Sequence, residues 1–462
     1  MHEVNPADPD VDHAHRRGHA VGEQAVGDSD AEPVVAVEDV SDAGHDDPHA
    51  LQDRQVVASD VLSELEDRLR RYPEERYPIQ HATAQFHRGI ELTNRGRLDE
   101  AADALGRAER IFDPGRLPVE HAKTLNALGA VLRLRGQAEE AAALFERAAA
   151  ALMEAGQPLD AGAARFNLGL ARRDAGDEEA AIAALEQARD LLDPERVPAQ
   201  AAAAARELGA ILLAAGDPER ALPSLEGAVR LAEQSSDRAG LGAAANALGL
   251  ARLATGDPVG AIDDFRSAVV AHPRTIRPAE HAMAKANLAL AHEAAGDERR
   301  ARIAAAQART VAGAPDPVAR QAEAVLDRLG RPRGDLMSLL DAEPPERWPG
   351  LVRDELLRLL DEPPAERDAE LGAWVGAEVA RLQNGVEIVE AWLATLLELP
   401  PPDMETLVRG IVGATGRLDP EAAERVRADV GAATARFHMP QLLRLEDAFD
   451  RCAVELGQRP WS

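Results

Sequence analysis

The chain has 462 residues, of which 81 are acidic and 52 are lysine or arginine, so its formal net charge is −29. This excess of negative charge argues against nucleic acid and anionic membranes as main partners. A single cysteine excludes an intramolecular disulfide, and the abundance of alanine, leucine, glutamate and arginine beside only 3% aromatic residues predicts an all-α protein.

The first 58 residues differ in composition from the rest of the chain. They are acidic, rich in histidine and aspartate and poor in large apolar residues, so we expect a disordered tail over 1–58. His13, His15 and His19 stand near aspartates, but their spacing matches no closed site and we expect no bound metal. The sequence shows no export signal and no apolar run that could span a bilayer, so a cytoplasmic protein is the simplest interpretation.

The next segment, 59–79, combines a short amphipathic pattern with a Tyr-Pro loop. Val61, Leu62, Leu65 and Leu69 fall on one helical stripe. The loop is similar to connections that recur later in the chain. We therefore expect 59–79 to be an N-terminal cap that covers the apolar face of a repeat array.

A turn recurs every 40 residues between 80 and 330. Each copy has small residues before and after the turn, with a large apolar residue nearby, as two closely crossing helices require. The turn glycine ends the first helix of each copy, and the six glycines are Gly96, Gly136, Gly176, Gly216, Gly256 and Gly296. A fixed period in this range predicts a solenoid of helical hairpins.

A second period, of 80 residues, lies within the first. The segments after copies one, three and five contain a proline-flanked loop, as in DPGRLPVEHA, whereas those after copies two and four do not. Two interpretations stay open. The alternation is a relic of a duplicated two-repeat unit, or alternate loops face a partner.

The array ends before residue 335. Residues 317–330 read as a capping helix, and RPRGD at 331–335 breaks the pattern. All four tryptophans lie beyond it, at Trp348, Trp374, Trp392 and Trp461. We expect 335–462 to be a separate helical bundle, whose Leu- and Trp-bearing stripes form either its core or a homodimer interface.

The repeated pattern resembles the tetratricopeptide repeat family. The matching residues are two alanine columns, at Ala101 and Ala108 and their equivalents, and the Leu-Gly pairs of copies two to five, of which Leu128-Gly129 is the first. The usual period of the family is ~34 residues, so each copy here is longer. The resemblance implies a right-handed superhelical solenoid, in which the first helix of each pair lines a concave groove that binds a protein or peptide segment.

Helical spacing then selects the side chains expected in that groove. They are Phe86, Lys123, Asn126, Arg133, Phe166, Asn167, Arg173, Arg206, Asn246 and Asn287. Asparagine can clamp a peptide backbone, the cations can accept carboxylates, and the phenylalanines can seat apolar side chains. The alternative is that the asparagines only satisfy neighbouring helices.

No catalytic motif stands out in the sequence. GxxxxGK[ST], GxSxG and HExxH are all missing, and Cys452 has no nearby histidine, so we expect a buried thiol and no cofactor. The leading hypothesis is a non-enzymatic adaptor that binds a protein or peptide segment. The alternatives are a regulatory sensor that closes around a small peptide or ligand, and an enzyme with its site in 335–462.

Overall fold

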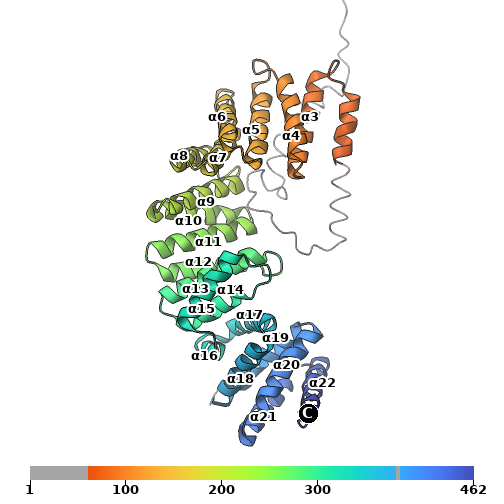
Figure 1. Cartoon of the computed structure of the whole chain (residues 1–462), viewed down its shortest axis with the longest axis vertical. Coiled ribbons are helices and arrows are strands. Elements are labelled where there is room, and N and C mark those ends of the chain that lie inside the picture. Colours follow the sequence, from red (N-terminus) through yellow and green to blue (C-terminus); the bar gives the residue numbers. More distant parts are fainter. Residues whose placement is uncertain (1–60, 381–384, 462) are drawn as a thin grey trace, which may run out of the picture. The chain divides into compact units, whose positions relative to one another are not determined.

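The computed structural model describes residues 61–380 and 385–461 (Figure 1), so the predicted tail 1–58 lies outside the described residues. Every regular element in these two ranges is a helix, which confirms the all-α prediction. The chain divides into two compact units, residues 1–240 and 241–462, and each is described by itself.

The described part of the first unit consists of a helix over 61–71 and four helical hairpins. The hairpins are α3(Pro78–Asn94)–α4(Leu98–Ile111), α5(Pro118–Leu134)–α6(Ala138–Glu154), α7(Pro158–Asp174)–α8(Glu178–Leu191) and α9(Pro198–Ala214)–α10(Pro218–Gln234). The second helix of each hairpin packs against the first helix of the next. Leu62 lies in one buried apolar cluster with Leu92 and Leu105 of the first hairpin.

Glycine permits both the turn and the crossing of each hairpin. Gly216, between α9 and α10, has a φ of 79°, which a side chain disfavours. Gly209 lies where α9 crosses α10, and a Cβ atom there would stand 2.4 Å from Cγ of Leu225. The two helices therefore approach to a distance that only glycine allows.

Two kinds of connection share the same repeat length. α4 and α8 have 14 residues and are followed by the six-residue connections 112–117 and 192–197. α6 and α10 have 17 residues and are followed by connections of only three. Both combinations take the same length of chain, so the first helices begin every 40 residues while the connections alternate. In the long connection 112–117, His121 Nδ1 donates to the Phe112 carbonyl oxygen at 2.9 Å.

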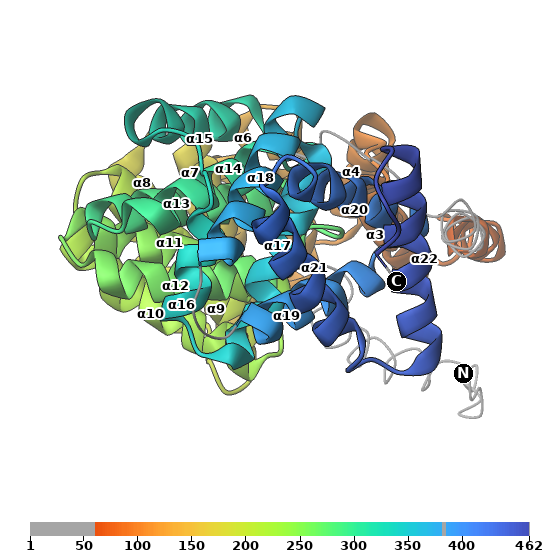
Figure 2. The same ribbon diagram turned by 90° about the horizontal axis from the view of Figure 1, so that it is seen from below.

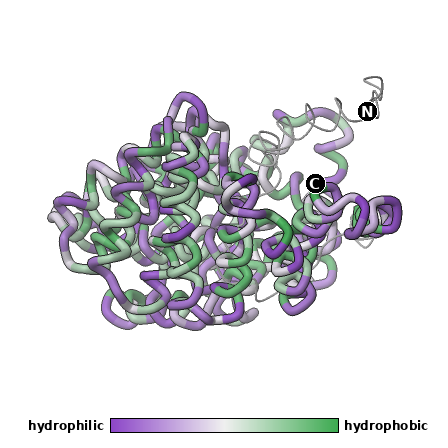
Figure 3. Tube along the Cα trace, turned by 90° about the horizontal axis from the view of Figure 1, so that it is seen from above, coloured by the Kyte–Doolittle hydropathy of each residue, from purple (hydrophilic) through white to green (hydrophobic). Residues whose placement is uncertain are grey.

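The second unit continues the hairpins and adds a bundle. Its helices are α11(Arg238–Ala254), α12(Pro258–Ala271), α13(Pro278–Ala294), α14(Glu298–Arg309), α15(Asp316–Leu329), α16(Asp335–Ala342), the 3-10 turn η1(Pro345–Arg347), α17(Trp348–Asp361), α18(Pro364–Ala380), α19(Gly385–Glu398), α20(Pro401–Thr415), α21(Pro420–Thr434) and α22(Met439–Glu455). Helix α15 packs on α13 and α14, and α16 and α17 lie against α14 (Figure 2). Hydrophobic and hydrophilic residues are interspersed along the helices of the chain, as amphipathic packing requires (Figure 3).

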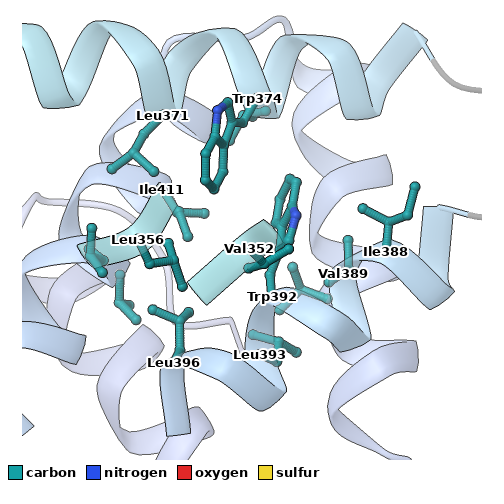
Figure 4. Close-up of a cluster of buried hydrophobic side chains, with 14 of the residues drawn as sticks. Val352, Leu356, Leu371, Trp374, Ile388, Val389, Trp392, Leu393, Leu396 and Ile411 are labelled. Atoms are coloured by element: carbon teal, nitrogen blue, oxygen red, sulfur yellow. The ribbon is translucent and has the colours of Figure 1, made fainter. Parts of the chain in front are cut away.

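The helices after residue 335 share one apolar core. Trp374 and Trp392 are buried in it, with ring centroids 5.6 Å apart, among Val352, Leu356 and Leu396 (Figure 4). The stripes of α18 and α19 thus pack within the chain. Ile303 of α14 belongs to the same cluster, so the last hairpin reaches the edge of this core.

Candidate functional site

The residues predicted for the groove lie along the first helices of successive hairpins. We call this set the first-helix face. In the first unit it comprises Phe86, Lys123, Asn126, Arg133, Phe166, Asn167, Arg173 and Arg206, which come from α3, α5, α7 and α9. In the second unit it comprises Asn246 on α11 and Asn287 on α13.

Two asparagines of the first unit bind each other. Asn167 Nδ2 donates to Asn126 Oδ1 at 3.0 Å and so joins α7 to α5. Asn167 is buried, whereas Asn126 is half-buried. The bond uses one N–H group and one oxygen, so the amino group of Asn126 still has both its hydrogens for another acceptor. The pairing is a contact between neighbouring helices, and it also fixes the direction in which Asn126 points.

A longer row of amides crosses the second unit. Asn287 Nδ2 donates to Asn246 Oδ1 at 3.0 Å, and Gln321 Nε2 of α15 donates to Asn287 Oδ1 at 2.9 Å. All donors point the same way along the row. Gln321 is not among the predicted residues, because it lies in a helix expected only to cap the array.

The cations of the first unit take part in a chain of ion pairs. Asp174 forms ion pairs with Arg133 at 2.9 Å and with Arg173 at 3.1 Å. Glu207 forms ion pairs with Arg173 at 2.7 Å and with Arg206 at 3.0 Å. The charges therefore alternate across α5, α7 and α9, and each arginine is held in place by at least one carboxylate.

Acidic partners make this face nearly neutral. Lys123 pairs with Asp160 at 3.0 Å, so four cations meet three acids and the face has a net charge of +1. The three acids are absent from the residues predicted for the groove. A signal was present for two of them, because Asp174 follows Arg173 and Glu207 follows Arg206 in the sequence.

The two phenylalanines contribute mainly to packing. Phe166 is 5% exposed. Phe86 is half-buried and contacts two apolar clusters, one containing Leu105 and the other Phe112. Phe86 therefore offers more free surface than Phe166 to an apolar side chain.

Helix α13 also carries two buried histidines. Burial lowers the pKa of His292 to about 4, and burial lowers the pKa of His281 as well. His281 Nδ1 donates to the His272 carbonyl oxygen at 2.9 Å. Both rings are therefore neutral at pH 7.

Neither a metal site nor a membrane span is found in the part of the chain that the structure describes. Over 61–380 and 385–461 there is no group of three or more His, Cys, Asp or Glu residues that could hold a metal ion. Among the helices of the same ranges, none is long and apolar enough to cross a membrane.

The helical hairpins and their turn glycines define a helical-repeat protein. Residues 120–193 and 200–269 match the family model described as Tetratricopeptide repeat. These two segments thus belong to the tetratricopeptide repeat family, as the sequence resemblance predicted. The match supports a protein-interaction scaffold in general terms. None of the curated proteins matches this chain.

Several solved structures resemble the chain. BtubC (BKLC) from P. vanneervenii is 17% identical, and the similarity covers 54% of this chain and 94% of that one with a TM-score of 0.39. PilF from Pseudomonas aeruginosa is 18% identical, with coverages of 53% and 96% and a TM-score of 0.41. The apo form of RapI is 13% identical, with coverages of 60% and 96% and a TM-score of 0.42. At these values the similarity says nothing about what this chain binds.

Proposed function

We propose that the protein is a non-enzymatic adaptor whose first-helix face binds a peptide or protein segment. The observation that carries this proposal is the chain of alternating charges from Arg133 to Arg206. Arg173, at its centre, is held by Asp174 and Glu207, yet its side chain is still 42% exposed. A cation that is oriented before binding loses less conformational entropy when a ligand arrives.

The chemistry of the face suggests the ligand. A partly acidic segment, extended or helical, would place a carboxylate beside Arg173, where it competes with Glu207. The amino group of Asn126 would donate to a backbone carbonyl of the same segment. Since the face has a net charge of only +1, affinity would come from matched hydrogen bonds and apolar burial more than from bulk attraction.

The remaining parts of the proposal follow from the whole chain. A net charge of −29 supports a protein partner in preference to nucleic acid or an anionic membrane. We infer a cytoplasmic location, no cofactor, and a second binding role for the helices after residue 335. The absence of a recognised catalytic motif in the sequence supports a binding role for the chain.

The test combines capture with direct binding. Full-length protein and a Lys123→Ala, Asn126→Ala, Arg173→Ala variant are used to capture partners from the native host. Peptides from any captured protein are then titrated against both by fluorescence anisotropy. We expect the variant to bind the peptide at least about tenfold more weakly, from the loss of two charge-assisted hydrogen bonds.

A matched control removes exposed arginines from second helices. The Arg110→Ala, Arg189→Ala variant loses similar charge on α4 and α8. It should bind the peptide like the wild type. Equal affinity for all three proteins would refute the first-helix face as the binding surface.

A further inference from the structure

The last hairpin holds two acid pairs of the bundle through four side chains. The acid pairs are Asp354-Glu355 and Asp361-Glu362, in and just after α17. The four donors are Arg274, Lys285, Gln307 and Arg309, from α13, α14 and the connection before α13, and we call them the end face. All eight residues belong to the second unit.

Each acid has its own donor on the end face. Lys285 Nζ donates to Asp354 Oδ2 at 2.7 Å, and Gln307 Nε2 donates to Glu355 Oε1 at 2.7 Å. Lys285 also donates to Gln307 Oε1 at 2.7 Å, which joins the two donors.

The second acid pair is held in the same way. Arg309 Nη2 donates to both carboxylate oxygens of Glu362 at 2.6 Å, and Arg274 pairs with Asp361. Seven residues separate equivalent members of the two acid pairs. This is about two helical turns, so both pairs fall on one side of the helix.

Two further ion pairs also join a cation of the last hairpin to an acid of the bundle. Arg302 binds Asp335 through two hydrogen bonds of 2.8 and 3.0 Å, and Arg300 pairs with Glu343. In both pairs the last hairpin supplies the cation and the bundle supplies the acid. Arg358 of α17 also pairs with Glu355 at 2.8 Å and with Glu362 at 3.2 Å, so the bundle neutralises part of its own acid surface. The contact is a cationic surface of the hairpin against a mainly anionic surface of the bundle.

The apolar part of this contact is small. Ile303 is the one residue before 331 in the buried cluster of the bundle, among the residues that the structure describes. Buried ion pairs are costly to desolvate, and apolar replacements often hold a fold equally well. A charged contact between two parts of one chain is instead typical of interfaces at which the two parts can move apart. Its matched charges also determine which surface can bind there.

A short link with a glycine at either end joins α15 to α16. Gly330 and Gly334 have φ values of 84° and 73°, and Gly334 N–H donates to Glu370 Oε1 at 2.9 Å. A rotation of the bundle at this link would break that hydrogen bond but no helix.

We propose that the end face is a second binding surface, specific for an acidic helix of a partner protein that carries two acid pairs seven residues apart. Helix α17 occupies this surface as a tethered competitor. Binding of a partner exchanges one set of ion pairs for an equivalent set, so the affinity depends on the local concentration of α17. This surface is distinct from the first-helix face.

The test uses full-length protein and one defined probe. The probe is a fluorescent synthetic peptide with the sequence of residues 348–366. In the loosened variant, Asp354→Asn and Asp361→Asn, the altered side chains are 41% and 45% exposed in the wild type, so the new amides can reach water. We expect this variant to bind the probe at least about tenfold more tightly than the wild type, because its own helix competes less.

Four controls define the specificity. A Glu421→Gln, Glu446→Gln variant loses the same charge elsewhere in the bundle and should bind like the wild type. Adding Arg274→Gln to the loosened variant should weaken its binding of the probe. Raising the salt concentration from about 0.1 to about 0.5 M should weaken that binding as well. Arg173→Ala, on the first-helix face, should leave the affinity for the probe unchanged. A failure of the end-face proposal can therefore be distinguished from a failure of the proposed adaptor site.

A second variant keeps the proposal testable if the loosened variant does not fold. A flexible Gly-Ser insertion after Gly330 lowers the local concentration of α17 without replacing any residue of the end face or of the two acid pairs. This variant too should bind the probe more tightly. The proposal is overturned if both variants keep wild-type helical content and bind no better than the wild type. It is also overturned if a probe with neutral acid pairs binds equally well, or if the loosened variants dimerise, because the occupant would then be a second copy.

Discussion

The crossing of α9 and α10 gives a quantitative test of the packing argument. Replacement of Gly209 by alanine adds a Cβ atom 2.4 Å from Cγ of Leu225, which is fully buried. An ordinary contact is longer by more than 1 Å, so the helices or Leu225 must move; such overpacking costs about 1–3 kcal/mol or more. Alanine also gains ~1 kcal/mol of helix propensity over glycine. We expect a net loss of about 1–2 kcal/mol in the free energy of unfolding.

Gly227 in α10 of the same hairpin is the matched control. The nearest heavy atom to a Cβ there is Arg230 Nη2 at 3.8 Å, so alanine fits without a clash. Gly227→Ala should stabilise the hairpin by about 0.5–1 kcal/mol through propensity alone. The two substitutions are chemically identical and differ only in the space around them.

The assay is urea unfolding followed by circular dichroism, with hydrogen exchange of residues 198–234 as a local probe. Leu225→Ala should cost about 2–5 kcal/mol alone. It should also relieve the clash, so the double variant with Gly209→Ala should show a favourable coupling of about 1 kcal/mol or more. If Gly209→Ala is as stable as Gly227→Ala, close crossing does not explain the glycine.

Three further predictions concern single residues. The stability of a His292→Gln variant should be less sensitive to acid than that of the wild type. Burial lowers the pKa of His292 to about 4, below the ~6.5 of an unfolded histidine. The neutral ring therefore contributes its full stability above pH ~6.5, and this contribution is lost as pH falls toward the folded-state pKa. Between pH 7 and 5 the wild type should lose about 2 kcal/mol of unfolding free energy relative to this variant in urea titrations; equal losses in the two proteins would contradict the burial argument. Trp374→Ala removes a side chain that is 1% exposed and should cost about 3–5 kcal/mol in the bundle, measured by urea unfolding; unchanged stability would contradict the assigned core. Glu207→Gln should cost about 2 kcal/mol in thermal unfolding, because Arg173 and Arg206 lose their shared carboxylate; an equal loss on replacing the exposed Glu195 by glutamine would point to a general charge effect.

The helical hairpins could be predicted from the sequence because their signals are local. A glycine with positive φ, small residues at a crossing and proline at a helix start all act over a few residues. The second hairpin shows the result: its turn glycine was expected at Gly136, and Gly136 lies between α5 and α6 with a φ of 78°. The 80-residue alternation could also be seen in the sequence. The sequence did not show that it consists of two helix lengths balanced by two connection lengths.

Only the tertiary structure decided which polar side chains meet. Arg133 binds Asp174, and Asn126 binds Asn167, 41 residues away in each case and so one residue out of register with the repeat. The repeat period places helices side by side but does not give the small rotation of each about its axis, and that rotation decides which atoms come within hydrogen-bond distance. For the same reason the acids of α17 could be read in the sequence, but their donors on α13 and α14 could not. Local periodicity therefore determined the scaffold, whereas packing between helices determined the charges that each surface presents.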